Sequence, residues 1–94
     1  MNKVWWIGIL EYEDGRVETV TRDGAPVMIN NWRNPASILF ALGHKVEEAA
    51  ISATQNGFIL NPEYKKMYYP EEKICIGQNP GKGYKLYIIP NKRS

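Results

Sequence analysis

The chain has 94 residues, of which 44% are hydrophobic and 23% charged. These proportions exclude general disorder, and the length predicts one small domain, residues 1–94, with a modest core. The single cysteine excludes an intrachain disulfide framework. The apolar start of the chain is too short for a membrane span and lacks a cleavage site, so we expect a cytoplasmic protein that makes no membrane contact.

The charge is small in total but unevenly distributed. The net charge of +2 does not require a nucleic-acid partner. Residues 1–60 carry five Lys or Arg and seven Asp or Glu, whereas residues 61–94 carry seven and three. This basic C-terminal third favours an anionic ligand as one alternative.

The first third of the chain predicts strands. Residues 3–12 are rich in Val, Trp and Ile and form the first expected strand, and Glu13-Asp14-Gly15 is typical of a hairpin turn. Residues 16–22 alternate polar and β-branched side chains, so we expect them to pair back as a more exposed strand. After a turn at residues 23–26, residues 27–29 form either a short strand or a buried approach to the next element.

The next stretch has a helical period and predicts a helix over residues 35–56. Asn34 is a favourable N-cap, Pro35 suits the first helical position, and Asn56-Gly57 is a favourable stop. The apolar residues that share one face of this helix are Ile38, Leu42, Val46, Ala49, Ala50 and Ala53.

Gly43 interrupts this period and leaves two alternatives open. Because the apolar phase continues past Gly43, one long helix is consistent with the pattern. Glu47 and Glu48 instead suit the first turn of a second, nearly coaxial helix that starts near His44.

The last third again predicts strands. Residues 58–60 are short and apolar, and residues 64–69 are ambiguous. Residues 73–78 and 84–89 form two strands that the turn-rich loop 79–83 joins. The predicted fold class is therefore α+β, with a mainly antiparallel sheet of about five strands packed on one long or kinked helix, residues 35–56.

The first strand is apolar on both faces. Trp5, Ile7 and Ile9 point one way, and their neighbours, which include Trp6 and Leu10, point the other way. One explanation is that such strands are central in the sheet, that loops such as residues 61–70 cover the second face, or that the sheet curls into a partial barrel. The other is an apolar patch that meets a partner, a second copy of the chain or a stacking ligand.

The chain lacks the residues that catalysis or metal binding needs. His44 and Cys75 are the only residues of their kind, and no sequence pattern links them as a dyad. The loop Asn79-Pro80-Gly81-Lys82-Gly83 lies between two strands, whereas a phosphate-binding loop precedes a helix. We therefore expect neither an enzyme nor a metal or cofactor site.

Aromatic and basic side chains are the candidate binding residues. The segment 64–69 interleaves lysines and aromatics, as proteins that bind single-stranded nucleic acid do. The full candidate set is Trp5, Trp6, Lys65, Lys66, Tyr68, Tyr69, Lys82, Lys85 and Tyr87.

In its size and its lack of a catalytic motif, the chain resembles the compact accessory proteins with which phages and mobile elements block host defence enzymes. This resemblance implies a small non-enzymatic binding protein that inhibits a host defence protein by surface contact. A protein is then the expected partner, and a homodimer is a further alternative. The competing hypothesis is a nucleotide or nucleic-acid binder that sequesters an anionic ligand with Tyr and Lys side chains.

Overall fold

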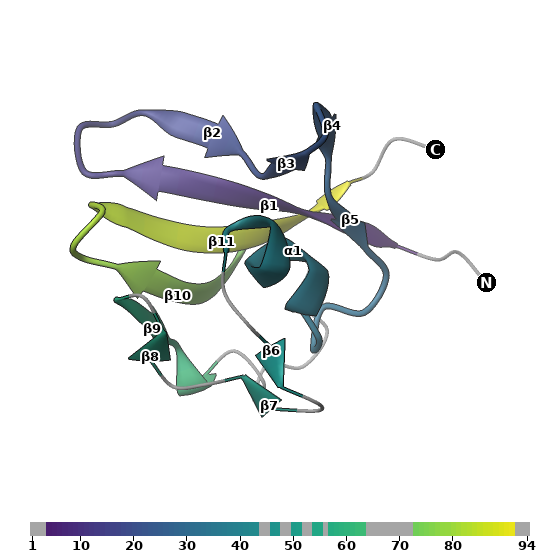
Figure 1. Cartoon of the computed structure of the whole chain (residues 1–94). Coiled ribbons are helices and arrows are strands. Elements are labelled where there is room, and N and C mark those ends of the chain that lie inside the picture. Colours follow the sequence, from purple (N-terminus) through teal and green to yellow (C-terminus); the bar gives the residue numbers. More distant parts are fainter. Residues whose placement is uncertain are drawn as a thin grey trace.

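A computed structural model describes residues 4–43, 46–47, 50–51, 54–55, 57–63 and 73–91 (Figure 1). In this part of the chain a seven-stranded antiparallel sheet and two smaller two-stranded sheets accompany one helix.

The main sheet has the strand order β2-β1-β11-β10-β9-β8, and β5 pairs with β1 on the same side as β2. Its strands are β1 Trp5–Tyr12, β2 Val17–Thr19, β5 Met28–Ile29, β8 Thr54–Gln55, β9 Phe58–Leu60, β10 Ile74–Asn79 and β11 Tyr84–Asn91. The two small sheets pair β3 Thr21–Arg22 with β4 Ala25–Pro26, and β6 Val46–Glu47 with β7 Ala50–Ile51.

The predicted fold class, an α+β sheet of about five strands packed on one long or kinked helix, is wrong, because the described residues form a mostly antiparallel sheet with one short helix. The helix α1 spans Ala36–Ala41, and the short strands β6, β7 and β8 follow it, so the described residues contain no long or kinked helix over 35–56. Its start lies one residue later than the sequence predicts, because Pro35 and not Asn34 occupies the N-cap position. The side-chain Oδ1 of Asn34 accepts a hydrogen bond of 3.3 Å from the Ala36 amide.

The helix ends because of Gly43. The Gly43 amide donates to the Phe40 carbonyl at 3.0 Å, and Gly43 has a φ of 88°. A left-handed residue directly after a helix turns the chain away from the helix axis, and glycine adopts this conformation without strain. Val46 and Ala50 therefore lie in β6 and β7 and do not continue the predicted helical face, whereas Ala49 and Ala53 lie outside the described residues.

The centre of the sheet is the pair β1–β11. These strands are antiparallel and pair over their whole length, from Trp5 opposite Asn91 to Tyr12 opposite Tyr84. The predicted hairpin at residues 79–83 joins β10 to β11, and the buried Asn79 holds its turn. The Asn79 carbonyl accepts hydrogen bonds from the amides of Lys82 and Gly83, at 3.1 and 2.8 Å.

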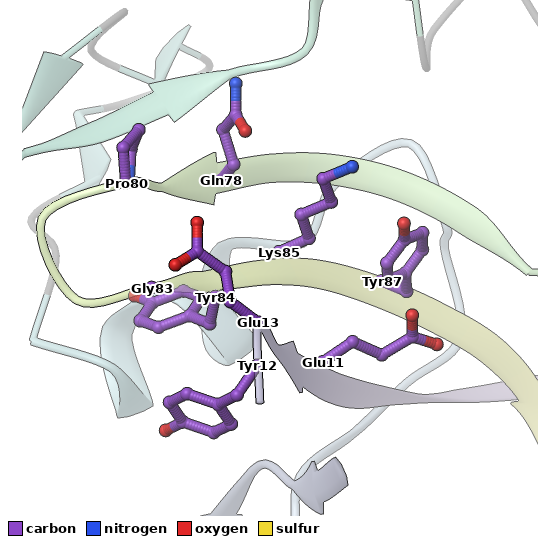
Figure 2. A pocket seen from close by; sticks show the side chains of 9 residues that line it. All are labelled: Glu11, Tyr12, Glu13, Gln78, Pro80, Gly83, Tyr84, Lys85 and Tyr87. Atoms are coloured by element: carbon purple, nitrogen blue, oxygen red, sulfur yellow. The ribbon is translucent and has the colours of Figure 1, made fainter. Parts of the chain in front are cut away.

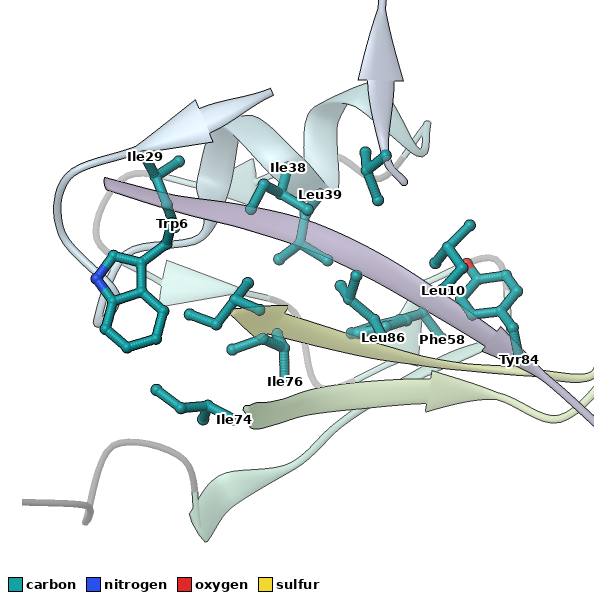
Figure 3. Close-up of a cluster of buried hydrophobic side chains, with 12 residues drawn as sticks. Trp6, Leu10, Ile29, Ile38, Leu39, Phe58, Ile74, Ile76, Tyr84 and Leu86 are labelled. Carbon is teal, nitrogen blue, oxygen red and sulfur yellow. The ribbon is translucent and has the colours of Figure 1, made fainter. Parts of the chain in front are cut away.

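One face of the sheet, which we call the inner face, carries the hydrophobic core (Figure 3). The helix α1 lies on this face through Ile38 and Leu39, which are both fully buried. The helix approaches β1 closely at Gly8, where a Cβ atom would lie 2.8 Å from Ile38 Cγ2. The sheet supplies the core residues Trp6, Leu10, Phe58, Ile74, Ile76, Tyr84, Leu86 and Ile88.

A second close approach occurs at a bulge in β10. The register with β11 shifts between Cys75 and Gly77, and the ring of Phe58 from β9 lies directly on Gly77. A Cβ atom at this position would lie 2.5 Å from the Ile59 carbonyl oxygen and would overlap the Phe58 ring. Only glycine fits there without movement of the neighbouring strand.

The described residues include no helix that is long and apolar enough to cross a membrane. The cytoplasmic location itself stays a prediction.

We predict that Gly77→Ala lowers the free energy of unfolding by about 2–3 kcal/mol, because the new methyl group overpacks the core against a strand backbone. The matched control is Gly81→Ala, in the turn, where the nearest atom to an added Cβ is Asn79 Oδ1 at an ordinary 3.5 Å. This control should change stability by less than about 0.5 kcal/mol. Urea denaturation measures both changes, and equal losses would contradict the close packing at Gly77.

Candidate functional site

The second face of the sheet, which we call the outer face, remains apolar and accessible. Because side chains alternate along a strand and the core residues Trp6 and Leu10 face α1, Trp5, Ile7 and Ile9 of β1 point away from α1. Trp5 is 43% exposed, and Ile7 and Ile9 are half-buried. The register places Tyr87 and Ile89 of β11 directly opposite Ile9 and Ile7, so these four side chains form the centre of the outer face.

Further apolar side chains extend the outer face on both sides. Met28 of β5 lies opposite Ile7, and Val17 of β2 lies opposite Glu11. Ile59 of β9 lies opposite Gln78 at the other side of the sheet. All three side chains are exposed, at 46%, 60% and 43%. The outer face is thus an apolar surface that spans several strands, and such surfaces are typical of interaction sites.

Charged residues lie at one end of the outer face. The Lys73 ammonium donates to Glu11 Oε2 at 2.7 Å and lies 4.4 Å from the centroid of the Tyr87 ring. The hydrogen bond to Glu11 raises the pKa of Lys73. Lys85 lies opposite Glu11 in the strand register and is exposed, and it makes no ion pair with any described residue.

Two shallow hollows lie beside Lys85 and share Gln78, Lys85 and Tyr87 as lining residues. The first, of about 280 Å³, also contains Glu11 and Glu13 (Figure 2). The second, of about 490 Å³, continues toward Ile59, Pro62 and Cys75 and is mostly apolar. Each of these open hollows has room for a side chain of a partner, whereas neither encloses a small molecule.

The structure separates the residues that the sequence predicted for binding. Trp5, Lys85 and Tyr87 share the outer face, with Trp5 and Lys85 toward opposite ends of the β1–β11 pair, and Lys82 is exposed in the β10–β11 turn. Trp6 lies in the core at 4% exposure, so only Trp5 of this pair is available to a partner. The remaining candidates, which are Lys65, Lys66, Tyr68 and Tyr69, lie outside the described residues.

Sequence reasoning missed Glu11 and Lys73 as members of this site. Strand alternation alone would have placed Glu11 on the same face as Trp5, Ile7 and Ile9. The ion pair between Glu11 and Lys73 joins residues 62 positions apart in the chain, and no local pattern indicates it.

The described residues offer little for catalysis. Cys75 lies half-buried on the outer face, and its Sγ donates to the Gly77 carbonyl at 3.7 Å. Burial raises the pKa of this thiol, so the unreactive protonated form predominates at neutral pH. His44 lies outside the described residues. Where the structure describes the chain, no three His, Cys, Asp or Glu residues are grouped so that they could hold a metal ion.

Comparison of the chain with protein-family models, with curated proteins and with solved structures finds no match.

We predict that Cys75 reacts with a disulfide reagent more slowly than free glutathione at neutral pH, and that its rate rises as the pH approaches the raised pKa of the thiol. The absorbance of the released thiolate measures the rate. The urea-unfolded protein is the control, because unfolding exposes the same cysteine to solvent. A rate in the folded protein that exceeds that of glutathione would identify an activated cysteine.

Proposed function

We propose that this protein is a non-enzymatic protein-binding domain that acts through the outer face of its sheet. The observation that supports this function is the exposed apolar surface around Trp5, Ile7, Ile9, Tyr87 and Ile89. These side chains extend from the two central strands, so the backbone beneath them is held in the sheet. An interface on such a rigid support requires little ordering when the partner binds.

The composition of the outer face fits a protein partner. Protein interfaces combine an apolar centre that contains aromatic anchors with a polar rim, and Trp and Tyr dominate their binding energy. Trp5, which is exposed, is such an anchor here, and Glu11, Lys73 and Lys85 supply the rim. The open hollows beside Lys85 can take protruding side chains of the partner.

The alternative of a nucleotide or nucleic-acid ligand fits the described residues less well. Glu11 and Glu13 line the same hollow as Lys85, and their carboxylates would repel a phosphate. The Lys73 ammonium already lies over the Tyr87 ring, where a base would have to stack. The more specific hypothesis, a phage or mobile-element inhibitor of a host defence protein, stays a prediction from chain size.

We predict that Trp5→Ser weakens binding to the partner at least about tenfold, because it removes the exposed aromatic anchor of the outer face. The partner is the protein that mass spectrometry identifies with the tagged chain after purification from its native cells, and titration calorimetry measures the affinity. The matched control is Phe40→Ser, an aromatic residue of α1 that is 58% exposed. Equal affinities of the two variants, both folded by circular dichroism, would contradict the proposed function.

The salt dependence of binding separates the two candidate functions. For a protein partner we expect the affinity to fall less than about tenfold between low and moderate salt, because apolar contacts dominate. A ligand held by several phosphates would lose more, since each neutralised phosphate releases counterions. A steep salt dependence together with wild-type affinity of Trp5→Ser would favour the anionic ligand.

A further inference from the structure

We infer that the protein bound by the outer face is a second copy of this chain, in a twofold-symmetric dimer in which β1 of each copy lies over β11 of the other. This inference depends on the proposed function, because it names the occupant of the same surface.

The cross-strand pairs of β1 and β11 make the outer face self-complementary. Along the sheet, the outward-pointing pairs are Trp5 with Asn91, Ile7 with Ile89, Ile9 with Tyr87 and Glu11 with Lys85. The twofold axis of the dimer runs parallel to these strands, midway between the two sheets. Rotation about this axis places each residue of one copy over the cross-strand partner of the same residue in the other copy. Apolar residues then meet apolar residues at the centre.

The same operation pairs the charges. Glu11 of each copy lies over Lys85 of the other, so the dimer forms two symmetric contacts between opposite charges at one end of the interface. Both groups are available for these contacts. Lys85 is exposed and makes no ion pair with a described residue, and its side chain lies near that of Glu11 (Figure 2). Glu11 accepts from Lys73 through Oε2, and its Oε1 makes no ion pair with any described residue.

The size of the outer face suits such a dimer. Two antiparallel sheets pack face to face at about 10 Å, which gives a β-sandwich whose second sheet comes from the other copy. The strands β1 and β11 have eight residues each and are about 26 Å long, whereas β10 has six residues and β2 and β5 have three and two. At about 4.8 Å per strand, the flat footprint of these strands is on the order of 400 Å². The relief of the side chains raises the accessible area toward the roughly 800 Å² per partner that stable dimers bury.

A charge-reversal experiment tests this arrangement. Sedimentation velocity and native mass spectrometry measure the fraction of dimer in four samples. These samples are the wild type, Glu11→Lys, Lys85→Glu and a mixture of the two variants. We expect the wild type to dimerise and each variant to dissociate at least about tenfold more readily, because like charges now meet across the interface. The mixture should form heterodimers, since a copy with lysine at both positions then faces a copy with glutamate at both.

The control is Glu18→Lys, which makes the same charge change on β2. Glu18 lies opposite Leu10 and so does not point to the outer face. This variant should dimerise like the wild type. Lys85 is exposed and makes no ion pair with a described residue, so Lys85→Glu breaks no such contact within one copy. This variant therefore gives an independent result if Glu11→Lys does not fold.

A wild-type protein that remains monomeric at all concentrations would overturn the inference, and so would a mixture that forms no more heterodimer than either variant forms homodimer. Either result would overturn the dimer without overturning the proposed protein-binding function. A monomer whose Trp5→Ser variant still loses affinity for a different protein would retain the binding function and assign the outer face to that protein.

Discussion

The antiparallel pairing of β1 with β11 is the constraint on which the rest of the structure depends. It joins the first and last described strands over eight residue pairs, so the two ends of the described chain lie side by side at the centre of the sheet. The remaining strands add to its two sides, with β2 and β5 along β1 and β10 along β11. Since side chains alternate along both strands, this one pairing also decides which residues face α1 and which face outward.

The inner face depends on two glycines that allow close packing. The helix α1 can lie on β1 because Gly8 leaves room for Ile38, and Phe58 can cover β10 because Gly77 lies at a bulge. A β-bulge places an extra residue in one strand and bends it locally. Here the bulge brings Gly77 beneath the Phe58 ring, while Cys75 and Gln78 line the hollow on the outer face.

The outer face combines hydrophobic and charged groups in a way that stability alone does not require. Exposed apolar side chains gain little free energy from folding, because they remain in contact with water. The proposed partner would supply the missing burial. The charged residues at one end would then give this partner a preferred orientation, since opposite charges attract and like charges repel across a contact.

The strands at both ends of the chain could be predicted from the sequence, because their β-branched and aromatic runs and their turns at Glu13-Asp14-Gly15 and residues 79–83 are local features. The extent of the helix could not. A spacing of three and four over residues 38–53 is compatible with a helix, whereas the left-handed conformation of Gly43 and the pairing of β6 with β7 depend on the tertiary structure. The same holds for the candidate site. Alternation separates Trp5 from Trp6, but the position of α1 decides which is buried, and only the register of two strands far apart in the chain places Glu11 beside Lys85.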